Sequence, residues 1–358
     1  MLSFDFFFFL LLLSCLYSIR DTLHRFVERS PCRVVGQKTM LGSLPSVVLV
    51  TGGAGLVGRA VEVVTKRNAC ADERWVFLSR HDADLRSMAA TRCVFERHKP
   101  THVLHLAARV GGLFKNMAAP VEMWIDNVSI NNNVLECCRT YGVRKAVSCL
   151  STCIFPERAT YPIGEETLHD GPPHYSNEQY AYAKRMIDVL NRAYNKEYGC
   201  RFTSVIPTNV YGPHDNYNLQ DSHVIPGLIH KFYLAKRENK PMVVMGSGRP
   251  LRQFVYSEDL AELIVWVLRH YEEVEPIILS VDECDELCIA DVAKLIAQSI
   301  GFTGNIVFDP SKADGQYRKT ADNAKLRRYL PDYRFTPVAE GIQRSVEWFI
   351  ANYDVARK

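Results

Sequence analysis

Residues 47–58 read Val47-Val48-Leu49-Val50-Thr51-Gly52-Gly53-Ala54-Gly55-Leu56-Val57-Gly58, and this stretch decides the fold. Four consecutive apolar residues rich in valine are typical of a strand buried on both faces of a parallel sheet. The glycines allow a tight turn and let the backbone approach a pyrophosphate at the start of the helix predicted over 59–66. A glycine pattern alone is weak evidence, but its position between strand and helix favours a dinucleotide-binding loop over a merely structural turn.

The alternation of strand and helix continues beyond the glycine loop. Strands are predicted at 75–78, 102–107 and 145–150, and helices at 88–98 and 121–141. Segments of this length predict an α/β fold, a Rossmann-type doubly wound parallel sheet with right-handed connections. Ligands bind such sheets at the carboxyl ends of the strands. The glycine loop and the residues that follow 106, 150 and 205 are therefore expected to line one cleft.

Three regions are predicted along the chain of 358 residues, which is long enough for two domains. Residues 46–213 are expected to form the dinucleotide-binding Rossmann domain. Residues 214–358 are expected to form a smaller α/β substrate lobe with a helix at 224–236 and a strand at 242–245. Segments within about 252–278, including Phe254–Tyr256 and a helix over 259–270, are expected to return to the Rossmann sheet.

The first 45 residues differ from the rest. An unbroken apolar run at 6–13 is followed by scattered arginines, and it is short for a membrane span, which needs about 20 residues. A signal peptide is disfavoured because Asp5 precedes the run and no small-residue cleavage site follows it. We predict a leader outside the fold, dispensable from Met40, and a cytoplasmic protein. A signal anchor, an organelle-targeting leader and upstream sequence that is not normally translated stay open as alternatives for this segment. Membrane contact is expected only if this leader is present in the mature chain.

Composition narrows the classes of partner. The formal net charge is +3 and no block of like charge occurs, so neither nucleic acid nor a membrane surface is indicated. The eleven cysteines show no paired metal-binding pattern. We therefore expect free thiols in a reducing compartment and no metal site.

The stretch from Leu150 to Lys184 carries the candidate catalytic groups. Ser151 and Cys153 follow an apolar run, and Tyr180 and Lys184 stand four residues apart on a predicted helix, so they share one face. A neighbouring ammonium favours phenolate and is expected to lower the pKa of the tyrosine. Each feature also has a purely structural explanation. A tyrosine and a lysine four residues apart on a helix occur by chance, and a lone cysteine is often a small buried hydrophobic residue.

The residues after the second predicted strand bear on the choice of cofactor. An acidic residue there, about 20 residues beyond the glycines, binds the ribose 2′-hydroxyl of NAD. This chain has Ser79 and Arg80 at that point, a hydroxyl and a guanidinium that suit a 2′-phosphate. NADP (NADPH) is therefore favoured, although Asp82 or Asp84 could supply the carboxylate instead.

These motifs resemble the extended short-chain dehydrogenase/reductase family. Within it, the sequence from about residue 47 to near the C-terminus is similar to the GDP-L-fucose synthases, which are GDP-4-keto-6-deoxy-D-mannose 3,5-epimerase-4-reductases. The more specific likeness lies in three segments: Ser151-Thr152-Cys153-Ile154-Phe155-Pro156, Pro207-Thr208-Asn209-Val210-Tyr211-Gly212-Pro213-His214-Asp215-Asn216 and Ser222-His223-Val224-Ile225-Pro226. Cys153 and His223 distinguish this family from its sugar-epimerase relatives.

The resemblance implies two reactions in one site, acting on GDP-4-keto-6-deoxy-D-mannose to give GDP-L-fucose. Cys153 and His223 would act as base and acid in the inversion of C3 and C5, two carbons acidified by the C4 ketone. Ser151 and Tyr180 would bind the C4 oxygen, and Tyr180, supported by Lys184, would donate the proton during reduction at C4. A homodimer through the long helices beginning near 121 and 180 is also implied.

The resemblance also implies binding residues. The cofactor-binding set is Gly52, Gly55, Leu56, Val57, Gly58, Ser79, Arg80, Leu106, Ala107, Ala108, Tyr180, Lys184, Pro207, Asn209, Val210 and His223. The substrate-binding set is Asn209, Lys231, Arg252 and Lys319. Lys231 departs from the arginine expected in the family's bacterial members, which keeps the charge but loses the planar fork that grips a phosphate.

Two other classes of function remain open. A sugar-nucleotide 4-epimerase with tightly held NAD would share the fold, the serine and the Tyr180/Lys184 pair. Such an enzyme would not need Cys153 and His223, and it would prefer an acid after the second strand. A non-catalytic cofactor-sensing protein of this fold usually loses the tyrosine or the lysine, and both are present here.

Overall fold

A six-stranded, wholly parallel sheet forms the centre of the computed structural model, which describes residues 45–358 except 313 and 315. The strands lie in the order β10-β5-β4-β3-β1-β2, so the sheet grows in opposite directions from β1 and β3. Their bounds are β1 Ser46–Thr51, β2 Glu73–Phe77, β3 His102–His105, β4 Lys145–Cys149, β5 Phe202–Pro207 and β10 Ile277–Leu279. This order confirms the predicted doubly wound fold.

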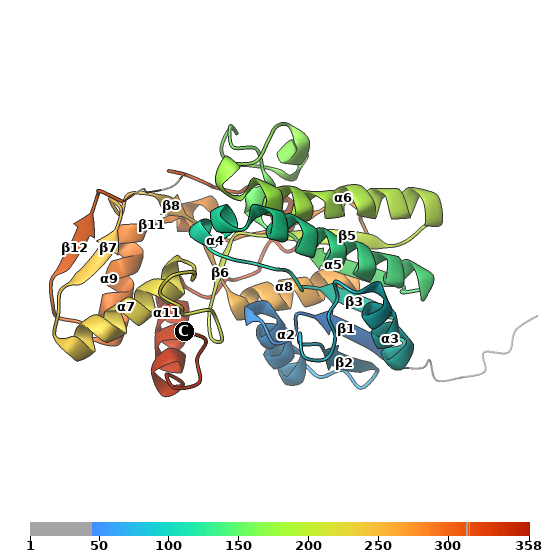
Figure 1. Ribbon diagram of the computed structural model, residues 1–358, viewed down its shortest axis with the longest axis horizontal. Helices are drawn as coiled ribbons and strands as arrows, with labels where there is room; N and C mark the ends of the chain where they lie inside the picture. The colour runs from blue at the N-terminus through green and yellow to red at the C-terminus, as the bar shows by residue number, and fades with distance from the viewer. Residues whose placement is uncertain (1–44, 313, 315) are drawn as a thin grey trace, which may run out of the picture. The chain divides into compact units, whose positions relative to one another are not determined.

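Helices cover both faces of the sheet (Figure 1). One face packs against α3 (Met88–His98), α5 (Pro120–Thr140) and α6 (Glu178–Tyr198). The other packs against α2 (Leu56–Arg67) and α8 (Ser257–His270). Strand β1 shows why its sequence has no polar alternation: Leu49 packs into the first layer, while Val48 and Val50 pack into the second.

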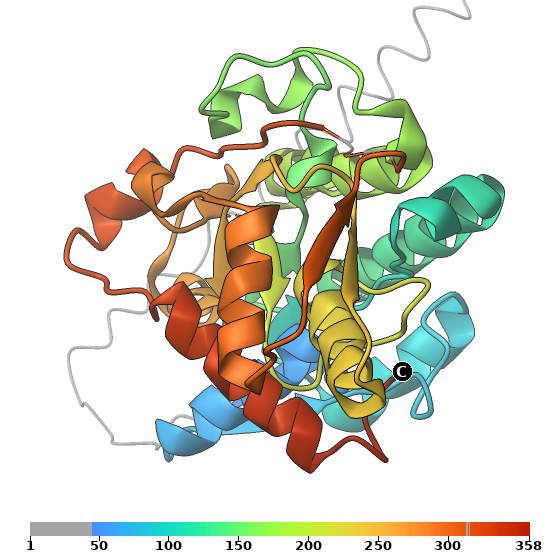
Figure 2. The ribbon, with the colours of Figure 1, turned by 90° about the vertical axis from the view of Figure 1, so that its left-hand side faces the viewer.

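A third hydrophobic cluster forms the smaller lobe, which faces the viewer in Figure 2. It is built from three helices packed on a two-stranded parallel sheet. The elements are α7 (Val224–Glu238), α9 (Ile289–Ile300), α11 (Val338–Ala351), β7 (Met242–Met245) and β12 (Ile306–Asp309). The helix and strand predicted at 224–236 and 242–245 are confirmed, whereas α9, β12 and α11 were not predicted.

The chain returns from the smaller lobe to the main sheet through α8 and β10, as expected for part of 252–278. The expectation for Phe254–Tyr256 was wrong, because this strand, β9, pairs instead with β6 (Asn209–Tyr211) in a separate two-stranded sheet. Three residues satisfy their backbone groups as well in a short pair as at a sheet edge, so their sequence does not select the partner.

Short elements complete the description. They are α4 (Leu113–Ala118), α10 (Ala324–Tyr329), β8 (Leu251–Arg252), β11 (Leu287–Cys288), and the 3₁₀ helices η1 Thr152–Ile154, η2 Glu165–His169, η3 Tyr175–Asn177 and η4 Glu283–Asp285. The nine cysteines of the described region are all free thiols, as expected. Within the same region no helix is long and apolar enough to cross a membrane. The leader predicted over 1–45 lies outside the described residues apart from residue 45.

Candidate active site

The glycine loop joins β1 to α2 and forms a cradle that side chains would fill. A Cβ on Gly58 would lie 2.6 Å from backbone atoms of Gly52 and Gly53, and one on Gly52, whose φ is +72°, would lie 2.8 Å from the Ala107 nitrogen. Gly55 caps α2 without a side chain, and the first turn of the helix has no acidic residue. The positive end of the α2 dipole is therefore available to a phosphate.

A buried hydrogen-bonded chain supports this loop from below. The Thr51 hydroxyl accepts from the backbone nitrogens of Leu106 and Ala107, so its own proton is directed to Nδ1 of His105, 2.9 Å away. Nε2 of His105 must then donate to Oδ1 of Asn131 at 3.0 Å, and Nδ2 of Asn131 donates to the Ala183 carbonyl at 3.1 Å. Complete burial lowers the pKa of His105 to about 3, so the ring is neutral.

Sequence reasoning missed this series of hydrogen bonds, although it connects the glycine loop to the helix that carries Tyr180 and Lys184. Its members are a strand-end threonine, a strand histidine and one of three consecutive asparagines, at 131–133. No spacing rule connects them in sequence. Only the pairing of β1 with β3, which sets Thr51 beside His105, brings them together.

Ser79 and Arg80 follow β2, as predicted. Asp82 accepts from both the backbone nitrogen and the hydroxyl of Ser79 at 2.7 Å, and Asp84 forms an ion pair with Arg86 at 2.8 Å. Both alternative carboxylates are therefore engaged locally. Arg80 is exposed and makes no hydrogen bond or ion pair with another described residue, so its guanidinium is available to an anion.

The turn after β4 presents Ser151 and Cys153 at the carboxyl edge of the sheet. The Ser151 side chain caps the 3₁₀ helix η1 by accepting from the Cys153 nitrogen at 3.4 Å. Both residues are half-buried. Ser151 therefore lies just beyond the carboxyl end of β4, and Cys153 lies in the short helix η1 that follows.

Tyr180 and Lys184 lie in the first two turns of α6. Lys184 is buried, and its Nζ donates to the Cys149 carbonyl at 2.8 Å, which fixes the ammonium against the end of β4. Burial raises the pKa of Tyr180 well above its ordinary value, with smaller contributions from Cys153 and Cys149. The expected lowering of this pKa is not seen, because desolvation of the phenolate dominates. The phenol is protonated at neutral pH, the form that donates a proton.

Cys153 lies among the charged groups of the site. Burial raises the pKa of its thiol, while the Ser151 hydroxyl and the ammonium groups of Lys319 and Lys184 oppose that rise. The same electrostatic coupling reaches Tyr180. The thiol of Cys153 thus interacts electrostatically with a phenol and two ammonium groups.

The smaller lobe supplies His223 and Lys231 from α7. His223 is the exposed N-cap residue of this helix, and desolvation by the surrounding chain lowers its pKa while Asp221 opposes the effect. The backbone of Asp221 approaches Gly112, which follows β3, so the loop before His223 reaches toward the sheet edge. Lys231 is half-buried two turns further along the helix, and burial lowers its pKa. No described contact joins His223 to Cys153.

The remaining predicted substrate residues lie around β8 and the segment before α10. Arg252 donates to the carbonyls of Leu251 at 2.6 Å and Gln316 at 2.6 Å, so its guanidinium is engaged by the backbone. Burial lowers the pKa of Lys319. The charge of Cys153 opposes this shift, and that of Arg252 adds to it. The ammonium of Lys319 therefore interacts electrostatically with Cys153, and Arg252 donates to the backbone of the segment that leads to Lys319.

The other predicted cofactor residues lie at the carboxyl edge of the sheet or in the first turn of α2. Asn209, at the start of β6, donates through both its backbone and side-chain nitrogens to the Gln253 carbonyl. The other members are Leu56 and Val57 in α2, Leu106, Ala107 and Ala108 after β3, and Pro207 and Val210 at the ends of β5 and in β6.

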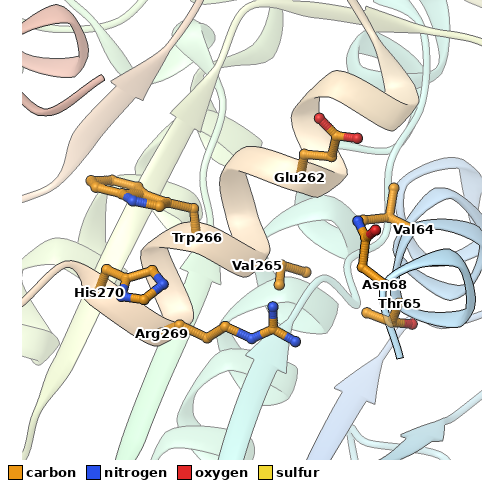
Figure 3. Close-up of a pocket in the computed structure, with 8 residues that line it drawn as sticks. All are labelled: Val64, Thr65, Asn68, Glu262, Val265, Trp266, Arg269 and His270. Carbon is orange, nitrogen blue, oxygen red and sulfur yellow. The ribbon is translucent and has the colours of Figure 1, made fainter. Parts of the chain in front are cut away.

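Two cavities open elsewhere on the protein. One of about 290 Å³ lies between α2 and α8 and is lined by Asn68, Trp266 and His270 among others (Figure 3). The other, of about 240 Å³, lies between the end of α7 and residues 301–305. None of the predicted site residues lines either cavity, so the candidate site is defined by the side chains at the sheet edge.

Comparison with known proteins gives matches over the whole described fold. The profile of the NAD dependent epimerase/dehydratase family matches residues 48–281. GDP-L-fucose synthase of Dictyostelium discoideum is 61% identical over 311 residues, covering 87% of this chain and 97% of that protein. A probable GDP-L-fucose synthase of Drosophila melanogaster is 56% identical over 318 residues, covering 87% and 99%.

A solved structure agrees with the sequence matches. The crystal structure of a GDP-L-fucose synthetase from Naegleria fowleri bound to NADP is similar with a TM-score of 0.84 and 51% identity, covering 88% of this chain and 97% of that chain. Identity at this level over nearly the full length of each relative extends beyond a shared fold. The chain therefore belongs to the NAD dependent epimerase/dehydratase family and, within it, to the GDP-L-fucose synthases.

Proposed function

We propose that this protein is a GDP-L-fucose synthase that inverts C3 and C5 of GDP-4-keto-6-deoxy-D-mannose and then reduces C4 with NADPH. The observation that carries the proposal is geometric: Lys184 of α6 donates to the Cys149 carbonyl at the end of β4, and Cys153 lies in the turn that follows this strand. The thiol also interacts electrostatically with Tyr180. A reductase needs the tyrosine and lysine, whereas a thiol at the same place suits proton transfer at carbons next to a ketone.

In the epimerisation, Ser151 and Tyr180 would hydrogen-bond the C4 oxygen and stabilise the enolate that forms when a proton leaves C3 or C5. We assign the removal of protons to Cys153 as thiolate and their return from the opposite side to His223. Lys184 and Lys319 favour that thiolate. The resting groups are a thiol and a neutral imidazole, because burial raises the pKa of Cys153 and desolvation lowers that of His223. Each inversion would therefore begin with the transfer of one proton from the thiol to the imidazole through solvent, and the resulting thiolate would act as base and the imidazolium as acid.

In the reduction, Tyr180 would donate its proton to the C4 oxygen. Lys184, held by the Cys149 carbonyl, places its positive charge where it stabilises the phenolate left behind. NADPH supplies the hydride that is delivered to C4. After the turnover, Tyr180 is reprotonated from solvent.

The residues fit a phosphorylated dinucleotide. The glycine loop and the open end of α2 would hold the pyrophosphate, and Arg80 would pair with the 2′-phosphate. Asp82 and Asp84 are engaged by Ser79 and Arg86, which argues against the alternative of a carboxylate on the 2′-hydroxyl of NAD. Lys231, Arg252, Lys319 and Asn209 are assigned to the sugar nucleotide.

The experiment supplies the purified protein with GDP-4-keto-6-deoxy-D-mannose and either NADPH or NADH in D₂O. We expect oxidation of NADPH, GDP-L-fucose as product, and deuterium at C3 and C5. Cys153→Ser is expected to lower the exchange by about 10²- to 10⁴-fold, since it removes an acid–base group. Cys93→Ser, at an exposed thiol of α3, is the matched control. A wild-type protein that oxidises neither cofactor would rule the proposal out and favour another sugar nucleotide.

We also propose a homodimer formed through α5 and α6. Helix α5 exposes Val121, Trp124 and Ile125 at helical spacing, and Val121 and Ile125 keep 66% and 55% of their surface exposed. Helix α6 packs beside it and exposes Val189. Sedimentation equilibrium tests this arrangement: a protein that stays monomeric at micromolar concentration, or a dimer unaffected by Ile125→Glu, contradicts it.

A further inference from the structure

Arg185 follows Lys184 on α6 and is a buried cation that no described carboxylate neutralises. Its Nε donates to the Ile154 carbonyl at 2.8 Å, and its Nη2 donates to the same oxygen. Its Nη1 donates to the Gly171 carbonyl at 2.8 Å. The guanidinium therefore joins α6 to two separate loops.

Two carbonyls that flank the turn of Ser151 and Cys153 are held by consecutive side chains of α6. Lys184 binds the Cys149 carbonyl on the N-terminal side of the turn, and Arg185 binds the Ile154 carbonyl on its C-terminal side. Ser151 and Cys153 lie between these two points. The turn is thus clamped at both ends by the helix that also carries the reductive tyrosine.

Hydrogen bonds that only held α6 to the two loops would not require a buried charge. Moving a cation out of water costs several kcal/mol unless its surroundings compensate, and neutral donors such as an amide would bind the same carbonyls. The planar fork of arginine can hold Ile154 and Gly171 in fixed directions at once, which an ammonium on a flexible stem cannot. The charge is also close enough to interact with Cys153.

We propose that Arg185 is a positioning residue for the Cys153 thiol, holding the C-terminal side of its turn so that the sulfur can take and return protons at C3 and C5. This inference rests on the proposed function. Reduction depends less on Arg185, because Lys184 anchors the N-terminal side of the turn and Tyr180 is placed by α6 itself. Loss of the guanidinium should therefore slow proton exchange more than reduction.

The test uses the full chain and two substitutions. Arg185→Met keeps an apolar stem and removes all three hydrogen bonds, while Arg185→Lys keeps the charge and loses the fork. Arg192→Met is the matched control, since Arg192 lies two turns further along α6, is half exposed, and pairs with Asp188 at 2.9 Å. The buried Asp188 keeps His169 as a second partner at 2.8 Å. Deuterium exchange at C3 and C5 is measured without cofactor, and NADPH oxidation and product configuration are measured with it.

We expect Arg185→Met to slow exchange by about 30-fold, the scale of a small misplacement of a reacting group, while NADPH oxidation falls by no more than about threefold. Part of the product should then be reduced at C4 without inversion at C3 and C5. Arg185→Lys should lie between Arg185→Met and wild type, and Arg192→Met should match wild type. Equal losses of exchange and reduction in both substitutions, with unchanged product, would overturn the proposal.

A second measurement does not depend on the substrate. The rate of Cys153 alkylation by iodoacetamide is followed against pH by peptide mass spectrometry, with NADPH affinity as the check on folding. Loss of the cation should move the Arg185→Met profile to higher pH, with Arg185→Lys closer to wild type. An identical profile in all variants would contradict the proposal. A wild-type protein inactive on the sugar nucleotide would refute the proposed function while leaving this readout available for Arg185.

Discussion

The cofactor half and the substrate half of the site are built in different ways. In the cofactor half, backbone contacts hold the glycine loop, and Thr51, His105 and Asn131 satisfy one another in a buried chain. In the proposed substrate half, His223 is exposed at the N-terminus of α7. In the loop that leads to this helix, the buried Asp215 has one oxygen, Oδ2, without a partner among the described residues. The first half is rigidly arranged, and the second retains unsatisfied and adjustable groups.

The difference follows from where the groups come from. Parallel strands deliver their carboxyl ends to one edge, so residues after β1, β3 and β4 meet without further adjustment. The groups of the smaller lobe come from loops and from α7, which rest on a separate hydrophobic cluster. Substitutions in the cofactor half should therefore weaken cofactor binding strongly. Substitutions in the substrate half should be tolerated, and some should improve stability or substrate binding.

The largest effect is expected at Gly58. A methyl group there meets loop backbone at 2.6 Å, whereas one on Gly55 meets its nearest atom, the Gly52 oxygen, at 3.3 Å. Gly58→Ala should raise the Kd of NADPH by about 100-fold, corresponding to about 3 kcal/mol of overpacking. Gly55→Ala should change it by less than about tenfold. Titration of NADPH fluorescence measures both, and similar Kd values for the two variants would show that the cradle is not rigid.

An intermediate effect is expected at Asp215. Burial raises its pKa to about 7 from an ordinary value of 3.8. Between these two pH values the unfolded chain releases the proton while the folded chain keeps it, so the free energy of unfolding falls as pH rises. Asp215→Asn removes this loss and should stabilise the protein at pH 7.5 by about 2 kcal/mol, with little difference near pH 4.

Thermal unfolding of both proteins from pH 4 to pH 8 measures this difference, with Asp285→Asn, on the exposed η4, as the control. An advantage for Asp215→Asn that is equal at every pH would mean that the carboxyl does not titrate in this range. A buried, titrating carboxyl would then no longer distinguish the substrate half from the cofactor half.

The smallest effect is expected at Lys231. Lys231→Arg restores a planar fork on α7 and should lower the KM for the sugar nucleotide by about threefold, with kcat unchanged, because a guanidinium binds a diphosphate with two parallel hydrogen bonds. Lys240→Arg, beyond the end of the same helix, is the control. Steady-state kinetics measure KM and kcat for both variants. A higher KM for Lys231→Arg would show that this half is as tightly fitted as the cofactor half.

Sequence patterns predicted the parts of the site that depend on local order. The helix at 88–98 and the strand at 242–245 were predicted with the bounds they have. Ser151 and Cys153 were placed after a strand, and Tyr180 and Lys184 on one face of a helix. Strand β9 was assigned to the wrong sheet. The Thr51–His105–Asn131 chain and Arg185 were missed because their partners are distant in sequence.

The amino-acid sequence by itself determined the doubly wound fold, the phosphate loop and the family, because apolar periodicity, glycine conformations and short motifs act over a few residues. The tertiary structure alone decided the tautomer of His105, the raised pKa of Tyr180 and the clamping of the Cys153 turn by Arg185. These properties depend on burial and on hydrogen bonds between distant segments, and both exist only once the sheet and its helices have packed together.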